Sequence, residues 1–328
     1  MATLLLELSL TRIFSVVFYY HMAFLAISIA LFGLGVGGVF SYVVANWKSP
    51  LYTKLGRLSS INSLLVLLAL IIILAQGDSP GNWNFALIYF TTALPFFLSG
   101  TIVSLAVSEN MERIDRVYFY DLLGAAGGCL LLVPLLNQFG GPCTVIAAAI
   151  CFAVAAAVWH SIAGSVSGRA GSVALALALV AFLTYNQRHP IVDIHYAKGH
   201  KLQNEVWSKW NSISRIGVQT GPGGGGMIFI DADASTGIAN FDFSKLTPEA
   251  LDADRKALEL NPDDKDAQRY LQEHRDLLEQ GMALPYVVRP GAKTLVIDLA
   301  AAGTFRARSL RVATTSPQSR STTSSLPP

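Results

Sequence analysis

Long apolar segments within the first 187 residues constrain this chain more than any other feature of its sequence. A helix that crosses the hydrocarbon core of a bilayer needs roughly 17–25 largely apolar residues. Segments of about this length cover residues 2–18, 20–45, 60–76, 83–106, 118–139, 142–163 and 171–186. The sequence therefore predicts a multi-span α-helical membrane domain of about seven helices over residues 1–187.

Charged residues are distributed unevenly along the chain. They occupy 13 of the first 187 positions but 33 of the remaining 141, and only the second fraction is typical of a soluble domain. The sequence therefore predicts a soluble region from Arg188 onward. Basic and acidic residues nearly balance in both parts, which gives no support to nucleic-acid binding.

The first apolar segment does not have the organisation of a cleavable signal peptide. It lacks a basic leader and a small-residue cleavage site, and Glu7 and Arg12 interrupt its apolar run. Because the segment begins at Met1 with no polar leader, we expect part of a longer first helix to be missing.

Basic residues indicate how the helices are oriented. Loops on the cytoplasmic side of a membrane are enriched in Lys and Arg. The loops predicted after the second, fourth and sixth segments carry Lys48, Lys54, Arg57, Arg113, Arg116 and Arg169. The alternate loops carry no basic residue, so the basic loops are predicted to be cytoplasmic. If segment 171–186 crosses the membrane, the soluble region lies outside; if it is re-entrant or peripheral, that region stays in the cytoplasm.

Four polar residues in or beside the apolar segments allow two interpretations. A charged side chain in hydrocarbon is costly and commonly faces protein or a cavity. The residues are Glu7, Arg12, His21 and Asp121. They are candidates for an intramembrane substrate or ion site, or they are polar contacts at helix ends and between helices.

The glycine-rich stretch 33–38 indicates close helix packing, because small residues let helix backbones approach. The three cysteines show no paired spacing, so neither a disulfide nor a metal site is predicted from them. His195 and His200 have no Cys or carboxylate partner at ligand spacing, and we predict no metal site there.

The soluble region combines strand and helix signals. Alternating apolar residues in 214–220 and 227–231 predict two strands joined by a glycine-rich turn. An acidic helical stretch follows at 247–281, with Asn261-Pro262 ending one helix and Asp263 or Asp264 capping the next. Residues 293–298 are typical of a buried parallel strand.

Several motifs in this order resemble one family. They are ELSLTRIFS in the first segment, YFYDLLGAAGGCLLLVPLL in the fifth, and then WNSISRIGV, IDADASTGI and LPYVVRPGAKTLVI. Together they resemble the bacterial membrane-bound spermidine-synthase-like proteins over about residues 5–297. The resemblance implies a multi-pass protein of the bacterial inner (cytoplasmic) membrane, with a Rossmann-like α/β aminopropyltransferase domain after the spans. It also implies transfer of an aminopropyl or methyl group from decarboxylated S-adenosylmethionine or S-adenosylmethionine to a polyamine or other small amine. A homo-oligomer is the expected assembly.

The same resemblance suggests substrate-side residues. Trp210, Asn211, Ser212 and Arg215 match the family's WNSfSR element, whereas Asp231 and Thr236 match its substrate-side strand and turn. Two interpretations stay open. These residues contribute to an active-site lid or amine site, or they form a structural hairpin in which the Trp packs and the Asn and Arg bond loops.

The chain departs from the family after Ile297. From Leu299 to Pro328 it carries no acidic residue and consists largely of Ser, Thr, Arg, Ala and Pro. Such a composition does not build a sheet, so residues 299–328 are predicted to be a disordered tail, consistent with a frameshifted reading of the family's cofactor motifs. Residues 188–298 would then be a partial spermidine-synthase-like domain with no catalytic residue and no cofactor site.

Two functions follow as alternatives. The chain is a membrane-anchored spermidine-synthase-like protein that is inactive as encoded, or it is a transporter-like or membrane scaffold protein whose function resides in its helical spans. The bilayer is the predicted partner in both.

Overall fold

The computed structural model describes residues 1–75, 82–202, 205–220, 226–238 and 248–279. They belong to two compact units. The first unit comprises residues 1–219 and 229–235, and the second comprises residues 220–228 and 236–328. Each unit is described by itself below.

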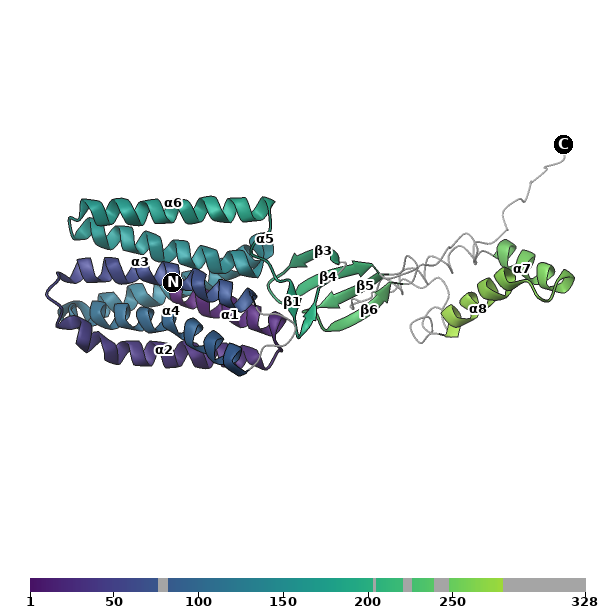
Figure 1. Ribbon diagram of the computed structural model, residues 1–328, viewed down its shortest axis with the longest axis horizontal. Coiled ribbons are helices and arrows are strands. Elements are labelled where there is room, and N and C mark those ends of the chain that lie inside the picture. Colours follow the sequence, from purple (N-terminus) through teal and green to yellow (C-terminus); the bar gives the residue numbers. More distant parts are fainter. Residues whose placement is uncertain (76–81, 203–204, 221–225, 239–247, 280–328) are drawn as a thin grey trace, which may run out of the picture. The chain divides into compact units, whose positions relative to one another are not determined.

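A bundle of long helices forms most of the first unit (Figure 1). The helices are α1 (Ala2–Val17), α2 (Met22–Ala45), α3 (Leu51–Leu74), α4 (Asn82–Ser108), α5 (Ile114–Ile162) and α6 (Val166–Arg188), with a short 3-10 helix η1 (Met111–Arg113) before α5. Among the described residues, the five helices α2 to α6 are long and apolar enough to cross a membrane. The prediction of a multi-span helical protein is therefore confirmed at this level. Helix α1 has 16 residues and falls below the length used for that assignment.

Helix α5 bends sharply at Gly140. This residue has φ 78° and ψ 174°, which lie outside the helical region, and Pro142 follows it. Proline cannot donate the helical hydrogen bond, and a glycine tolerates positive φ, so the bend has a local chemical cause. We call residues 114–139 the first arm of α5 and residues 141–162 its second arm. The first arm contains the predicted segment 118–139, and the second arm covers the predicted segment 142–163 except for its last residue.

Two helix boundaries differ from the sequence-based expectation. Helix α3 begins at Leu51 rather than at residue 60, so Lys54 and Arg57 lie in its first two turns and not in a loop. Lys54 is buried, and its Nζ donates to the carbonyl of Ala45 at 2.8 Å. Because this bond offsets the burial of the charge, the helix extends past a residue whose charge suggests a loop. Helix α6 has 23 residues and is longer than the predicted segment 171–186.

Close packing joins α2 to α4. A Cβ atom on Gly33 would lie 2.7 Å from Cβ of Phe96, and one on Gly37 would collide with the carbonyl of Phe97. Glycines at these positions let the two backbones approach, which confirms the packing role predicted for residues 33–38. Helix α1 lies in the main core, and its Leu5, Leu10 and Phe14 are fully or almost fully buried.

Short strands follow α6. They are β1 (Tyr196–Ala197), β2 (His200–Lys201), β3 (Glu205–Trp210), β4 (Arg215–Thr220), β5 (Gly226–Ile230) and β6 (Ala234–Ile238). β1 pairs with β2, and the other four form one sheet in the order β3-β4-β5-β6. β3 and β4 are antiparallel, with Trp210 opposite Arg215.

Strands β4 and β5 confirm the two strands predicted on either side of the glycine-rich segment. Neighbours in this sheet are also neighbours in sequence, which needs no crossover helix of the kind that builds a Rossmann-like sheet. The predicted parallel strand 293–298 and the predicted tail 299–328 lie outside the described residues. The Rossmann-like fold therefore stays a prediction.

A helical hairpin belongs to the second unit. It consists of α7 (Pro248–Leu260) and α8 (Lys265–Glu279). Asp264 caps α8, because its Oδ1 accepts hydrogen bonds from the backbone N–H groups of Asp266 and Ala267, both at 3.1 Å. This confirms the predicted helix, its break at Asn261-Pro262 and its second cap.

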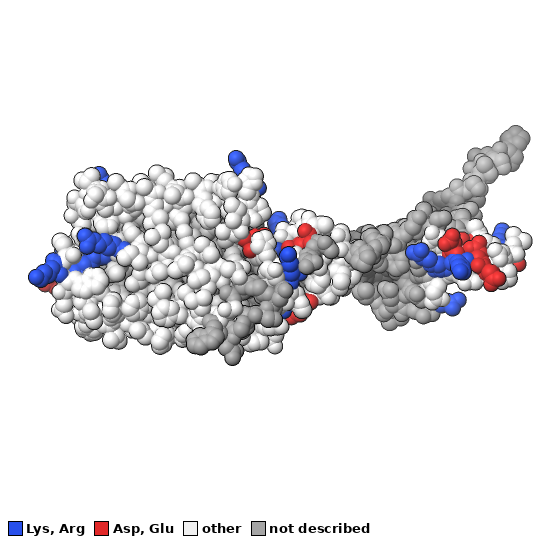
Figure 2. Space-filling model, viewed as in Figure 1, with Lys and Arg blue, Asp and Glu red and all other residues white. Residues whose placement is uncertain are grey.

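Charged side chains gather at the ends of the bundle. Figure 2 shows Lys and Arg at the left-hand end and an almost uncharged surface along the helices in this view. The basic end carries Lys48 between α2 and α3, Arg113 before α5 and Arg169 at the start of α6. The first four strands and the β5–β6 turn lie at the other end, beside the end of α1 and the bend in α5 (Figure 1). An uncharged band between two polar ends is what a bilayer requires.

Candidate functional site

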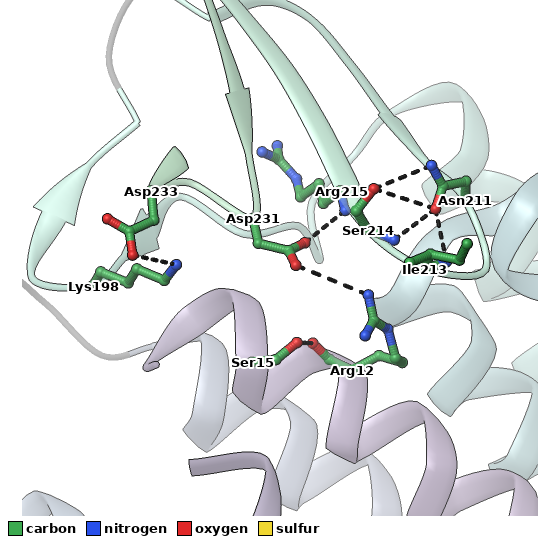
Figure 3. A network of polar contacts seen from close by, with 9 residues as sticks. All are labelled: Arg12, Ser15, Lys198, Asn211, Ile213, Ser214, Arg215, Asp231 and Asp233. Atoms are coloured by element: carbon green, nitrogen blue, oxygen red, sulfur yellow. Dashed lines mark hydrogen bonds and ion pairs between the residues drawn. The ribbon is translucent and has the colours of Figure 1, made fainter. Parts of the chain in front are cut away.

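A tight turn between β5 and β6 presents the carboxylate of Asp231. Asp231 and Ala232 have φ values of 50° and 58°, and the N–H of Asp233 donates to the carbonyl of Ile230 at 3.1 Å. Positive φ at both central residues is typical of the turn that joins neighbouring strands in a hairpin, and Asp adopts such values more readily than most residues. The turn directs Asp231 toward β4 on one side and α1 on the other (Figure 3).

Asp231 connects β4 with the membrane bundle. Its Oδ1 accepts a hydrogen bond from the backbone N–H of Arg215 at 2.8 Å, and its own N–H donates to the carbonyl of Arg215 at 2.8 Å. Its Oδ2 lies 4.0 Å from Nη2 of Arg12 on α1, and the two side chains are 26% and 24% exposed. The ion pair thus joins an apolar helix of the bundle to the β5–β6 turn.

Arg215 forms the most buried ion pair of this region. Its side chain is 2% exposed, and its Nη1 and Nη2 donate to the two carboxylate oxygens of Glu205 at 2.8 and 2.7 Å. Two parallel bonds of this kind fix the orientation of both groups. The pair links β3 to β4 from inside the sheet region.

The loop between β3 and β4 is closed by Asn211. Its Oδ1 accepts hydrogen bonds from the backbone N–H groups of Ile213 at 2.7 Å and Ser214 at 2.6 Å. Its Nδ2 donates to the hydroxyl of Ser214 at 3.1 Å. Asparagine often stabilises a turn through its own side chain in this way.

Trp210 packs against the bend in α5. The indole is 8% exposed, and a Cβ atom on Gly141 would lie 2.8 Å from its Cη2. A polar cavity of about 300 Å³ borders the indole, and its lining includes Asn186, Asp193 and Lys209. The end of β3 therefore rests directly on the bundle.

Lys198 ties the β1–β2 turn to the end of α1. Its backbone N–H donates to the carbonyl of Val17 at 2.7 Å, and its Nζ lies 3.3 Å from Oδ2 of Asp233. We call the polar residues of this region the junction network. It consists of Arg12, Lys198, Glu205, Asn211, Ser214, Arg215, Asp231 and Asp233.

The structure brings together most of the residues that the sequence suggested for the soluble region. Trp210, Asn211, Arg215 and Asp231 lie at the junction, and Arg12 joins them from the spans. Ser212 lies in the same loop, but the hydroxyl that bonds Asn211 belongs to Ser214. Thr236 lies in β6 and is not part of the junction network.

The four polar residues of the spans do not form one cluster. Met1 contacts the α5 backbone at Gly124, one turn from Asp121, whereas Arg12 lies roughly 16 Å further along α1, given 1.5 Å per residue. Glu7 lies between these levels. His21 lies in the turn before α2, where its ring stacks on Tyr19 with centroids 5.6 Å apart.

Sequence reasoning did not identify Glu205, Ser214 or Lys198. Pairing along the hairpin does not predict Glu205, because it lies opposite Gln219 while Arg215 lies opposite Trp210. The roles of Ser214 and Lys198 depend on turn geometry and on contact with α1, which the local sequence does not encode.

The charges of the junction network balance. Its three basic groups, Arg12, Lys198 and Arg215, each face a carboxylate. Within the described residues, no group of three or more His, Cys, Asp or Glu side chains could hold a metal ion. Within the junction network, the buried nitrogens without a hydrogen bond are Nε of Arg215 and Nε and Nη2 of Arg12. The arrangement is suited to fixing the sheet region on the bundle. It therefore favours the interpretation of these residues as a structural hairpin.

The chain matches no family model, no curated protein and no solved structure in the comparisons with known proteins.

Proposed function

We propose that this chain is a transporter-like protein of the bacterial cytoplasmic membrane, whose activity resides in its helical bundle. Seven helical segments would cross the membrane: α1 to α4, the two arms of α5, and α6. The length of the second arm of α5 supports counting the two arms separately, since its 22 residues extend about 33 Å at 1.5 Å per residue, near the thickness of the hydrocarbon core. Helix α1, with 16 residues, is the shortest of the seven.

The observation that carries the proposal is the position of the junction network relative to the basic residues. Lys48, Arg113 and Arg169 mark one end of the bundle, whereas the strands contact the opposite end at Val17 and Gly140. By the positive-inside rule the basic end faces the cytoplasm. This supports placement of the sheet region outside the cytoplasm, where it would cap the outer end of the bundle.

Outward placement argues against an enzyme that uses S-adenosyl donors, because those donors are made and held in the cytosol. Outward placement of the sheet region is compatible with a function that resides in the helical spans. Glu7 lies within α1 and Asp121 lies at the start of a predicted span, and charged side chains in spans are characteristic of transport pathways.

The membrane-anchored spermidine-synthase-like protein is the second candidate. One observation favours it: Trp210, Asn211, Arg215 and Asp231, the residues suggested by the resemblance, gather at one place. We expect the purified chain to bind no S-adenosyl donor and to transfer no aminopropyl or methyl group to putrescine. Measurable transfer would establish the second candidate.

Reporter fusions test the first candidate. Alkaline phosphatase is active only outside the cytoplasm, and green fluorescent protein exported by the general secretory route does not fluoresce. Fusions after Arg188 should give phosphatase activity without fluorescence, and fusions after Ser165, between α5 and α6, should give the reverse. Fluorescence from the Arg188 fusion would contradict the proposed orientation.

The transport function needs a separate test. Substitutions Glu7→Gln and Asp121→Asn should abolish uptake or efflux in cells that express the chain, while protein level and Arg188 topology remain unchanged. Normal flux of a screened panel of small ions and amines in both variants would contradict the transport proposal while leaving the orientation intact.

A further inference from the structure

A large apolar cavity lies at the basic end of the bundle, away from the junction network. Its volume is about 770 Å³. The start of α3, the end of α4, the start of the first arm of α5 and the end of its second arm line it. Its lining is mostly aliphatic and aromatic, and it includes Tyr52, Tyr118, Tyr120 and Trp159 together with the carboxylates Asp115 and Asp121.

The charges that line this cavity have one sign. No Lys, Arg or His is among the lining residues, although Arg113 and Arg116 are close in sequence. Within the described part of the chain, no ion pair or side-chain hydrogen bond is formed by Asp115 or Asp121. The cavity therefore combines an apolar lining with negative charge that the protein does not neutralise.

Asp121 has no structural role that explains its position. Asp115 lies in the first turn of α5, where a carboxylate interacts favourably with the positive end of the helix. Asp121 lies in the third turn, beyond the reach of that effect, and at the start of a predicted span. A carboxylate there is costly unless a positive charge comes to it.

Aromatic rings favour the same kind of ligand. Tyr52 and Trp159 are stacked, with ring centroids 5.8 Å apart and an interplanar angle of 18°. The faces of Trp and Tyr rings attract cations. Tyr118 and Tyr120 are more than half exposed, so a ligand can reach them from outside the bundle. An anion would meet two carboxylates, and an inorganic cation would leave the apolar lining without contacts.

We propose that this cavity binds an organic cation that carries an ammonium group on an apolar body. The ammonium faces Asp121, and the apolar body lies between the aromatic rings and the aliphatic side chains of α4. The site shares Asp121 with the transport proposal, but it is tested separately, since binding is measured on purified protein with no flux.

Three compounds that share a phenyl group separate charge from apolar contact. They are phenethylammonium, the neutral 2-phenylethanol and the anion phenylacetate. The purified full chain in lipid nanodiscs is titrated with each at pH 7 while tryptophan fluorescence excited at 295 nm is recorded. Phenethylammonium should give a saturable change in fluorescence, and this change should disappear in Trp159→Phe. Its affinity should be at least about tenfold above that of 2-phenylethanol, because it adds one favourable charge contact.

Variants locate the charge. Asp121→Asn should weaken binding of phenethylammonium about tenfold or more and leave binding of 2-phenylethanol unchanged. Glu112→Gln is the matched control, because Glu112 lies at the same end of the bundle but does not line the cavity, and it should bind as the parent does. Equilibrium dialysis with labelled phenethylammonium provides the affinity where a variant alters fluorescence, and thermal unfolding verifies that each variant is folded.

The opposing results are distinct. Equal affinity for phenethylammonium and 2-phenylethanol would mean an apolar groove occupied by lipid chains and would overturn the proposal. The same conclusion follows if Asp121→Asn binds phenethylammonium as tightly as the parent while remaining folded.

Discussion

Cδ1 of Trp210 lies 2.8 Å from the position that a Cβ atom would take on Gly140. Trp210 is the last residue of β3, and Gly140 is the point at which α5 bends. The bend therefore provides the space in which the sheet region meets the bundle. A side chain on Gly140 would disturb the helix bend and the strand contact together.

Substitution Gly140→Ala should destabilise the first unit by about 2–4 kcal/mol. Its φ of 78° with ψ of 174° is open essentially to glycine alone, and the added methyl group would overlap the indole. Thermal unfolding in detergent, followed by tryptophan fluorescence, measures the change. Gly127→Ala is the matched control in the first arm of α5, because nothing lies within 4 Å of its Cβ position, and it should be neutral or slightly stabilising. Equal effects of the two substitutions would contradict the role given to Gly140.

Substitution Glu205→Gln should destabilise the β3–β4 hairpin by about 3 kcal/mol. Arg215 is 2% exposed, so loss of the carboxylate leaves a buried charge without its counterion. Hydrogen exchange of the β3 and β4 amides measures this local stability.

The double variant Glu205→Leu with Arg215→Met is the control for that prediction. Apolar residues of similar size often replace a buried ion pair at little cost, so it should recover to within about 1 kcal/mol of the parent. If the double variant is less stable than Glu205→Gln, the loss does not arise from the uncompensated charge.

Substitution Asn211→Ala should destabilise the same hairpin by about 1–2 kcal/mol, because two backbone N–H groups lose their acceptor. Ser212→Ala, one residue away, should change its stability by less than about 0.5 kcal/mol, as expected away from bonded groups. Hydrogen exchange of the Ile213 and Ser214 amides reports both effects. A larger effect at Ser212 than at Asn211 would show that the loop is held differently.

The membrane helices followed from sequence because hydrocarbon imposes a minimum length on every apolar segment. The start of α3 could not be predicted in the same way. Lys54 carries a charge typical of a loop, and the hydrogen bond that accommodates this charge is made to the carbonyl of Ala45 in the preceding helix. Asn211 and Arg215 were predicted as a group because both belong to the motif that resembles the family's WNSfSR element. Their connection to Arg12 was not, because it depends on where a turn more than two hundred residues away meets α1.

The Arg12–Asp231 pair should contribute less than about 1 kcal/mol to stability, despite its position between the bundle and the sheet. The charged atoms are 4.0 Å apart and the side chains are about a quarter exposed, so solvent screens much of their attraction. Asp231→Asn removes the charge, retains an acceptor for the N–H of Arg215 and suits the positive φ of 50°. It should therefore lower the free energy of unfolding by less than about 1 kcal/mol. Asp231→Val removes charge and acceptor and places a branched side chain at that φ, so it should cost about 3 kcal/mol more. Thermal unfolding at low and high salt separates the two contacts of the Asp231 carboxylate, because the pair with Arg12 should weaken with salt and the bond from the N–H of Arg215 should not. Similar losses of stability in both variants would mean that the ion pair, and not the turn, holds the sheet on the bundle.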